Sequence, residues 1–303
     1  MKIEPSPISV CLPAIWLARS KKIPIFLWVL DLWPDTLKAV GVISSPRFLK
    51  LVSLFVRFIY SRCSILLLSS KMFFPSVSKL IGDERKLHYF PNWAEEIFFN
   101  YPNKQSKRQN DELRILFAGN VGEAQDFPTI IKAFSSFSPN EKIYLDVAGE
   151  GRKHKWLSNE IVKEGLQDRI RLLGKLDLSE MPKLYAEADA LLLALKDEAV
   201  FKLTVPAKLQ TYMASGKPVI CATGGESERV VHEAKAGVIC KPGSAMSIVA
   251  GIRELNGLSF ESRRRLGNNG RKFANEMFNR SQLIEKFENL VAYQLEQKSK
   301  KSL

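Results

Sequence analysis

Apolar residues alternate along the chain between short continuous runs and longer segments in which they recur every three or four positions. Runs of about four to eight apolar residues are typical of buried parallel strands, and the wider spacing is typical of helices packed on them. The pattern predicts strands at 23–30, 64–69, 114–118, 143–148, 170–173, 190–194 and 219–222. It predicts helices at 8–20, 46–62, 126–137, 179–188, 246–255, 261–277 and 281–294. Strands that alternate with helices in this way indicate an α/β fold with parallel sheets.

The stretch TVPAKLQTYMASGKPVICA, residues 204–222, gives this pattern most clearly. Pro206 suits the first turn of a helix, Gly216 suits its left-handed end, and an apolar strand follows. The positive end of such a helix would face the carboxyl edge of the sheet, where ligands bind in open α/β folds. Lys208 would lie in its first turn and Thr211 one turn further along. Ordinary helix packing with a solvent-facing lysine is the alternative interpretation.

Glycine turns follow three of the expected strands, at Gly119-Asn120-Val121-Gly122, Gly149-Glu150-Gly151 and Gly174-Lys175. Backbone N–H groups at such turns can bind phosphate, although tight packing of a strand against a helix explains glycines equally well. Asp31 and Trp33 follow the strand at 23–30 and would also lie at the carboxyl edge of a sheet. Asp31 could instead cap the next helix.

Composition is that of a globular protein: the 303 residues are 46% hydrophobic and 25% charged. This length accommodates two domains, and the polar stretch 100–112 suggests a boundary that gives domains 1–108 and 109–303. The four cysteines have no metal-like spacing and no secretory signal is present, so we expect reduced thiols and a cytoplasmic protein.

The net charge of +13 is concentrated in the first part of the chain, because residues 1–110 contain 16 basic and 7 acidic side chains (+9), and the remainder carries +4. No nucleic-acid motif or stacking platform accompanies these charges, so we expect no nucleic-acid partner. Segment 46–62 mixes Arg47, Lys50, Arg57 and Arg62 with apolar residues, which suits an anionic membrane surface. A helix packed on the sheet with its basic side chains in water has the same periodicity.

Three segments together, LRILFAGNVGEAQDFPTIIKAF, TVPAKLQTYMASGKPVICA and GGESERVVHEAKAGVICKPGS, resemble the C-terminal domain of glycosyltransferase family 4. The resemblance implies a GT-B fold, that is, two Rossmann-like domains with parallel sheets, with a final helix crossing back to the N-terminal domain. EPSPISVCLPA resembles the middle of a family protein, which predicts that the N-terminal, acceptor-side domain is incomplete. Asp31 and Trp33 would line the cleft as candidates, but no catalytic residue is assigned.

The resemblance implies a retaining transferase that moves a sugar from a nucleoside diphosphate donor, expected to be a UDP-sugar, without a metal or other cofactor. The subgroup with fucosamine-type transferases implies an N-acetylated amino sugar, a polyprenyl-diphosphate-linked acceptor, a role in O-antigen or capsule synthesis, and a peripheral position on the inner face of the cytoplasmic membrane. The implied donor-binding residues are Gly119, Asn120, Gly122, Gln125, Gly149, Glu150, Lys175, Pro206, Lys208 and Thr211.

This sequence departs from the majority pattern of the family. Asn120 and Gln125 stand where most members have cations, and Thr211 stands at the place of the second of two glutamates. Lys208 is therefore the best candidate for contact with the diphosphate. Two alternatives stay open, a catalytically impaired fragment or non-catalytic nucleotide-binding partner, and, with less support, a nucleotide-sugar epimerase of the same fold.

Overall fold

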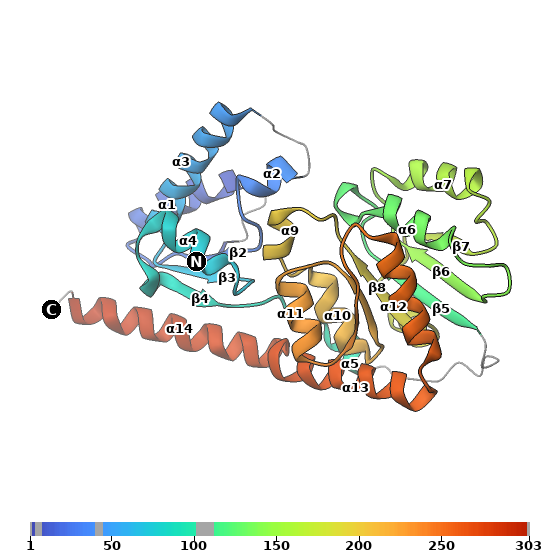
Figure 1. Cartoon of the computed structure of the whole chain (residues 1–303). Helices are drawn as coiled ribbons and strands as arrows, with labels where there is room; N and C mark the ends of the chain where they lie inside the picture. The colour runs from blue at the N-terminus through green and yellow to red at the C-terminus, as the bar shows by residue number, and fades with distance from the viewer. Residues whose placement is uncertain (1, 4–7, 40–44, 101–111, 302–303) are drawn as a thin grey trace. The chain divides into compact units, whose positions relative to one another are not determined.

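The computed structural model describes residues 2–3, 8–39, 45–100 and 112–301 (Figure 1). It divides into two compact α/β units, each with its own parallel sheet, which confirms the predicted fold class. Unit 1 comprises Met1–Asn92, Leu203–Val205 and Asn279–Leu303, and unit 2 comprises Trp93–Lys202 and Pro206–Phe278. The expected boundary at 108/109 lies within 101–111, outside the described residues.

Unit 2 contains a sheet of six parallel strands in the order β10-β9-β8-β5-β6-β7. The strands are β5 (Leu113–Ala118), β6 (Ile143–Ala148), β7 (Ile170–Gly174), β8 (Ala190–Ala194), β9 (Val219–Ala222) and β10 (Gly237–Ile239). All are parallel, with register pairs such as Leu116↔Asp146 and Leu191↔Val219. The chain starts in the middle of this sheet and winds outward in both directions, so the carboxyl ends of all six strands lie at one edge.

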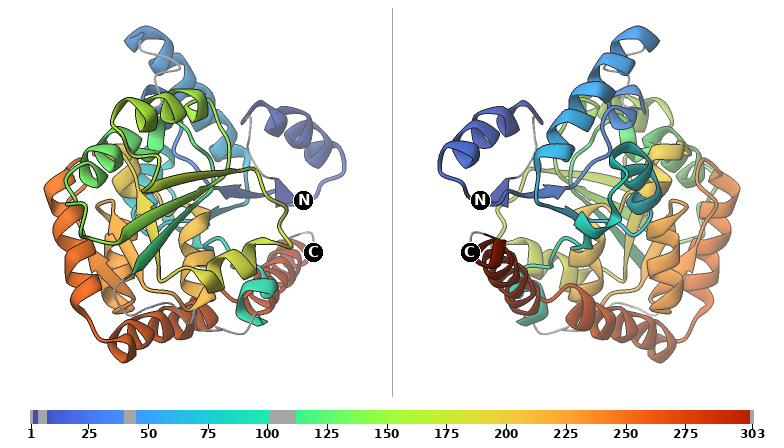
Figure 2. Two further views of the ribbon diagram at one scale, coloured as in Figure 1. Left: turned by 90° about the vertical axis from the view of Figure 1, so that its right-hand side faces the viewer. Right: turned by 90° about the vertical axis from the view of Figure 1, so that its left-hand side faces the viewer.

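Helices cover both faces of this sheet (Figures 1 and 2). One face carries α6 (Phe127–Phe134), α7 (His154–Lys163) and α12 (Ala245–Gly257), and the other carries α8 (Met181–Glu187), α10 (Ala207–Ser215), α11 (Glu226–Glu233) and α13 (Phe260–Met277). The short elements are α5 (Glu96–Asn100), α9 (Ala199–Leu203) and the 3-10 turn Glu123–Gln125. The helix expected from Ser179 begins at Met181 instead, because the Glu180 carboxylate accepts the N–H of Asp177 and closes a turn before it.

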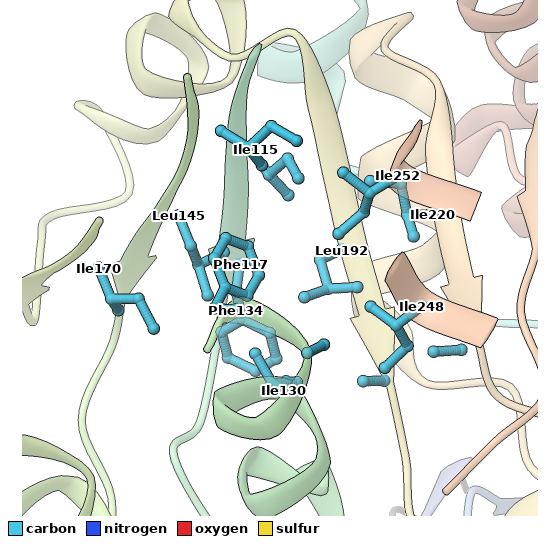
Figure 3. Packing of buried hydrophobic residues seen from close by; sticks show 14 of the residues in the cluster. Ile115, Phe117, Ile130, Phe134, Leu145, Ile170, Leu192, Ile220, Ile248 and Ile252 are labelled. Atoms are coloured by element: carbon cyan, nitrogen blue, oxygen red, sulfur yellow. The ribbon is translucent and has the colours of Figure 1, made fainter. Parts of the chain in front are cut away.

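The main core of unit 2 lies between the sheet and α6, α7 and α12. Alternate residues of β5 and β6 point into it, including Ile115, Phe117 and Leu145, and Phe134 of α6 packs against them (Figure 3). Two aromatic rings meet edge to face in this core, with the centres of Phe117 and Phe127 4.9 Å apart. Apolar side chains buried on both faces explain why these strands read as continuous hydrophobic runs.

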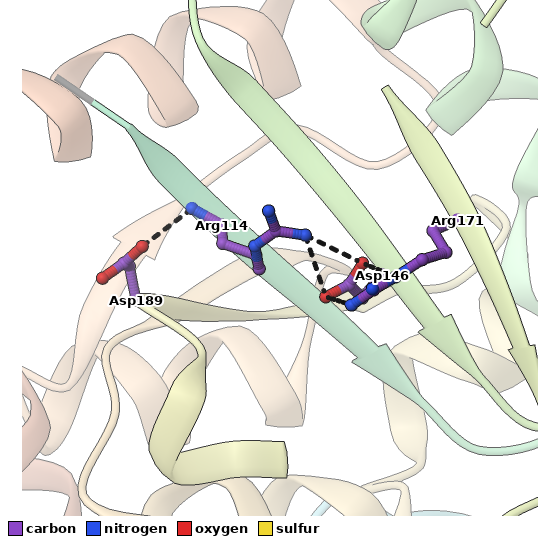
Figure 4. Close-up of polar contacts among 4 residues, drawn as sticks. All are labelled: Arg114, Asp146, Arg171 and Asp189. Carbon is purple, nitrogen blue, oxygen red and sulfur yellow. Dashed lines mark hydrogen bonds and ion pairs between the residues drawn. The ribbon is translucent and has the colours of Figure 1, made fainter. Parts of the chain in front are cut away.

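An ion-pair cluster crosses three strands of this sheet (Figure 4). The buried Asp146 carboxylate of β6 accepts hydrogen bonds from Arg171 of β7 at 3.0 Å, and from Arg114 of β5 at 3.4 Å. The backbone N–H of Arg114 also donates to the Asp189 carboxylate at 2.8 Å. These contacts tie β5, β6 and β7 together across the sheet.

Unit 1 contains a four-stranded parallel sheet in the order β1-β2-β3-β4. Its strands are β1 (Lys2–Ile3), β2 (Phe26–Val29), β3 (Ile65–Leu68) and β4 (Leu87–Tyr89). Its helices are α1 (Cys11–Ser20, after a 3-10 turn at Ile8–Val10), α2 (Asp35–Ala39), α3 (Pro46–Arg62), α4 (Phe73–Ile81) and α14 (Arg280–Lys301), with a further 3-10 turn at Glu84–Lys86. The bounds of α3 match the predicted helix 46–62.

The last helix, α14, packs on the sheet of unit 1. The Phe287 ring lies edge to face against Phe26 at 5.5 Å and near Phe90 at 6.2 Å, and the Lys286 ammonium donates to the Tyr89 carbonyl. Helix α14 therefore supplies part of the apolar core of this unit. Among the described residues no helix is both long and apolar enough to cross a membrane.

Candidate functional site

The carboxyl ends of β5, β6 and β7 approach one another unusually closely at three glycines. The N–H of Gly149 donates to the Gly174 carbonyl at 2.7 Å, and the N–H of Gly119 donates to the Ala148 carbonyl at 2.9 Å. Gly149 has a φ of +141°, and a Cβ on it would lie 1.9 Å from the Gly119 carbonyl oxygen. Only glycine fits there, so tight packing is one reason for the glycine turns that the sequence shows.

Helix α10 is held over the end of β5 by the hydroxyl of Tyr212. This hydroxyl donates to the Ala118 carbonyl at 3.1 Å and accepts the Ala118 N–H at 2.8 Å. Strand β5 pairs with β8 only at Ile115 and Leu116, so the tyrosine satisfies backbone groups beyond the point where that pairing stops. Burial raises the pKa of Tyr212, which keeps the hydroxyl neutral and able to make both contacts.

The C-terminal end of α10 is fixed by α13. The Arg271 guanidinium donates to the carbonyls of Ala214 and Ser215, both at 3.0 Å, and so satisfies the last turn of the helix. Gly216 has a φ of +74° and ends α10 in the left-handed conformation that the sequence predicted. Contacts within unit 2 therefore position α10 at Tyr212 and at its C-terminal end.

Lys208 lies in this first turn, four residues before Tyr212. Its Nζ is buried, has no hydrogen-bond partner in the described part of the chain, and lies 3.9 Å from the centre of the Phe117 ring. A Cβ placed on Gly119 would be 2.9 Å from this Nζ, so the ammonium lies directly against the first glycine turn. Burial lowers the pKa of Lys208 to about 7. A buried cation without an anion is costly, and a bound anion would remove that cost.

A pocket of about 340 Å³ opens beside Lys208. All of its lining residues belong to unit 2: Glu95, Phe98, Ala118, Gly119, Ala148, Gly149, Lys175, Leu176, Leu178, Met181, Tyr185, Ala207, Lys208 and Thr211. One part is apolar, where the Phe98 ring stacks on Tyr185 with centres 5.1 Å apart. Lys175, Lys208 and Thr211 supply polar groups. A mostly apolar pocket with a few convergent polar groups is typical of a small-molecule site.

The structure brings half of the predicted donor-binding residues to this pocket, namely Gly119, Gly149, Lys175, Lys208 and Thr211. Pro206 lies directly before them as the N-cap of α10. Their contact with a ligand stays a prediction.

The other four predicted residues, Asn120, Gly122, Gln125 and Glu150, build the adjacent turn and do not line the pocket. The Gln125 amide oxygen accepts the N–H of Gly122 at 3.1 Å, and the Glu150 carbonyl accepts the N–H of Val121 at 2.8 Å. The Gln125 side chain and the Glu150 carbonyl therefore have structural partners in the turn itself.

The two cleft candidates lie in unit 1, after β2. Asp31 is exposed and Trp33 is half-buried. Their role in a cleft stays a prediction.

Sequence reasoning missed the apolar part of the pocket and its carboxylate. Phe98 and Glu95 come from the segment directly before 101–111, and Tyr185 comes from α8. An aromatic residue at helical spacing reads as core, and Tyr185 also packs edge to face on Tyr212. Only the packing of α5 against α10 shows that these side chains share a pocket with Lys208.

Comparison with known proteins agrees with this fold. HepE of Anabaena, solved in complex with UDP, superposes with a TM-score of 0.77 at 14% identity, covering 96% of this chain and 78% of that one. WaaG, a glycosyltransferase involved in lipopolysaccharide biosynthesis, superposes with a TM-score of 0.68 at 15% identity, covering 92% and 81%. The fold is therefore the GT-B fold, as the sequence predicted.

The sequence itself matches the family described as glycosyl transferases group 1 over residues 101–273. The probable glycosyltransferase WbjE of Pseudomonas aeruginosa is 29% identical over 282 residues, which are 86% of this chain and 67% of that protein. The putative colanic acid biosynthesis glycosyl transferase WcaI of Escherichia coli K12 is 24% identical over 264 residues, which are 82% of this chain and 64% of that protein. The chain belongs to the group 1 glycosyltransferases, a family of transferase enzymes.

Proposed function

We propose that the chain transfers a sugar, with retention of configuration, from a UDP-sugar to a lipid-linked glycan in the synthesis of a bacterial surface polysaccharide. The observation that carries the donor assignment is the buried, unpartnered ammonium of Lys208 at the wall of the pocket. The UDP complex of HepE and the name of WcaI support the nucleotide and the product class. An N-acetylated amino sugar as donor follows from the resemblance of the sequence to fucosamine-type transferases.

The pocket offers a separate environment for each part of such a donor. The diphosphate would lie against Lys208 and the positive end of α10. The base would lie on the apolar surface that includes Phe98 and Met181, and Thr211 would offer a hydroxyl to the ribose. During transfer the diphosphate leaves with additional negative charge, and a fixed ammonium in a water-poor site stabilises that charge.

We propose that no divalent metal takes part, because two lysines are available at the pocket. Lys175, which is exposed, can approach from the end of β7, while Lys208 is buried below the glycine turn. Two cations at one diphosphate would supply the neutralisation that a magnesium ion supplies in other transferases. Transfer should therefore persist in excess chelator and fall when either lysine is replaced.

We also propose that unit 1 binds an anionic membrane surface. Helix α3 buries Val56, Ile59 and Tyr60 but leaves a second apolar stripe exposed, formed by Phe48, Leu51, Leu54 and Phe58. Arg47, Lys50, Arg57 and Arg62 flank this stripe and are all exposed. Packing on the sheet thus explains one face of the helix, and the basic, apolar outer face suits a lipid interface.

Helix α1, which contacts α3, extends this surface. The Trp16 side chain is 73% exposed, and the side chains of Leu12 and Leu17 on the same helix are exposed as well. Neither segment 5–30 nor segment 36–82 contains an acidic residue. This charge pattern favours attraction to anionic lipid, and it would bring the protein to a polyprenyl-diphosphate-linked acceptor on the cytoplasmic face of the membrane.

Transfer is tested by incubating the protein with UDP-sugars and polyprenyl-diphosphate-linked glycans, and by reading the anomeric configuration of the product by NMR. We expect a product with the configuration of the donor. A product with inverted configuration would contradict the retaining mechanism. Donor binding without any product under these conditions would favour a non-catalytic nucleotide-binding partner instead.

A further inference from the structure

The pocket beside Lys208 contains a carboxylate that the donor assignment leaves unexplained. Glu95 is the only acidic residue among those that line this pocket in the described structure. It is half-buried and lies directly before α5, which packs against α10. The indole N–H of Trp93 donates to its Oε1 at 3.1 Å, which orients the carboxylate. Glu95 is therefore an ordered part of the pocket wall.

A carboxylate is a poor neighbour for a diphosphate, because like charges in a partly buried site repel strongly. It is a good acceptor for hydroxyl groups, which donate short, charge-assisted hydrogen bonds. Lys208 and Lys175 are the cations of the pocket and suit phosphate, so the Glu95 carboxylate suits a part of the ligand that carries hydroxyls.

The position of Glu95 along the chain indicates which hydroxyls these are. Phe98 of α5 follows Glu95 by three residues, and its ring stacks on Tyr185 in the apolar part of the pocket. In a nucleoside diphosphate the ribose lies between the base and the phosphates. A carboxylate next to the base surface therefore meets the ribose, whereas the donor sugar lies beyond the diphosphate.

We propose that Glu95 binds the 2′- and 3′-hydroxyls of the donor ribose and makes the site selective for ribonucleotides. This inference rests on the proposed function, because it requires a nucleoside diphosphate in the pocket. Thr211 has one hydroxyl and a short side chain, so the Glu95 carboxylate adds the bidentate acceptor that a pair of vicinal hydroxyls requires.

The test compares ribose with deoxyribose ligands by calorimetry on the full chain. UDP and GDP are each titrated beside their 2′-deoxy and 3′-deoxy forms into the wild type, Glu95→Ala, Glu95→Gln and Glu96→Ala. Glu96 is the matched control, because it is the adjacent residue, carries the same charge, and is exposed outside the pocket. We expect the wild type to prefer the ribonucleotide by about ten- to a hundredfold, the range for hydrogen bonds to a charged acceptor.

Glu95→Ala should bind both forms within about twofold of each other, at the affinity that the wild type has for the deoxy form. Glu95→Gln, which keeps the shape and one acceptor oxygen, should show an intermediate preference, and Glu96→Ala should keep the full one. A wild-type preference that survives in Glu95→Ala or Glu95→Gln would overturn the assignment of Glu95 while leaving the donor site intact. If neither UDP nor GDP binds the wild type, the proposed function itself fails.

Discussion

The ammonium of Lys208 lies 3.9 Å from the centre of the Phe117 ring, and no hydrogen-bond acceptor contacts it within the described residues. An aromatic face stabilises a desolvated cation by about 2 kcal/mol, whereas the loss of hydration costs several kcal/mol. The ring therefore offsets only part of the cost. An anion that enters the pocket would offset the rest of the desolvation cost. We therefore expect Lys208 to be the centre of diphosphate binding.

Donor affinity should depend on pH through Lys208. Burial lowers the pKa of this ammonium in the free protein to about 7, and a bound diphosphate should raise it again. The protonated form binds better, so affinity should be highest near pH 6 to 7 and fall by up to about tenfold per unit as pH rises toward 9. UDP-glucose is the suitable ligand, because its diphosphate keeps the same charge over this range.

Calorimetry of UDP-glucose at several pH values in the wild type and Lys208→Met tests this dependence. The methionine variant should bind weakly with no slope between pH 7 and pH 9. Equal slopes in the two proteins would show that another group controls the titration.

The close contact of β5 and β6 predicts a strong effect of a single methyl group. Gly149→Ala would place a Cβ 1.9 Å from the Gly119 carbonyl oxygen at a φ of +141°, so the strand ends must separate. We expect a loss of about 2 to 4 kcal/mol in the free energy of unfolding, measured by chemical denaturation. Gly257→Ala is the control: its Cβ would meet nothing within 4 Å, in the last turn of α12, and it should be neutral or stabilising by up to about 1 kcal/mol. Similar losses in the two variants would contradict the packing argument.

The ion-pair cluster of Asp146 should contribute moderately to stability. The Asp146 side chain is 4% exposed, but those of its partners Arg114 and Arg171 are 26% and 61% exposed, so the guanidinium groups can regain water when the carboxylate is removed. Asp146→Asn should therefore cost about 1 to 3 kcal/mol, less than the 3 to 5 kcal/mol of a fully buried pair. Asp83→Asn breaks the surface pair with Arg85 and should leave thermal unfolding almost unchanged. Thermal unfolding at pH 7 compares them; a cost above about 3 kcal/mol for Asp146→Asn would show that the arginines cannot relax into solvent.

Membrane binding should depend on the outer face of α3. Replacing Arg47, Lys50, Arg57 and Arg62 by glutamine should lower the partition coefficient onto anionic vesicles by roughly two to three orders of magnitude, because each basic residue contributes about 1 kcal/mol. Vesicles of neutral lipid should bind both proteins weakly, and added salt should weaken binding of the wild type only.

Trp16→Ser tests the contribution of α1 separately. This variant should weaken binding to anionic vesicles with little change in its salt dependence, since it removes apolar area and no charge. If the fourfold variant sediments with anionic vesicles to the same extent as the wild type, the outer face of α3 binds a partner other than anionic lipid.

The sequence predicted the strands of unit 2 well because both faces of each strand are buried. The apolar residues of β6 and β8 do not recur at helical spacing, and the bounds of both strands match the prediction. The sequence could not give the strand order, because the pairing of β5 with β8 joins segments separated by about 75 residues. For α3 it gave the helix but not its orientation, since apolar residues occur around most of its circumference and only packing shows that Ile59 points inward and Leu51 outward.

The candidate site residues on α10 and at the glycine turns could also be predicted from the sequence, because the order of strands and helices along the chain places them. A helix start that follows a strand of a parallel sheet lies at the carboxyl edge, so Lys208 and Thr211 could be placed near Gly119 without a structure. Glu95 could not, because it reaches the pocket only through the contact of α5 with α10. The burial of the Lys208 ammonium was equally hidden, since a lysine in a first helical turn is usually solvated.

The central claim is that the pocket beside Lys208 binds a nucleoside diphosphate, and one calorimetric comparison tests it most directly. UDP and UDP-glucose are titrated at pH 7 into the wild type, Lys208→Met and Lys132→Met; Lys132, an exposed lysine of α6 outside the pocket, serves as the charge-matched control. We predict that Lys208→Met loses about ten- to a hundredfold in affinity for both ligands while Lys132→Met binds like the wild type. Equal affinities of the wild type and Lys208→Met, or no binding to the wild type in the millimolar range, would contradict the claim.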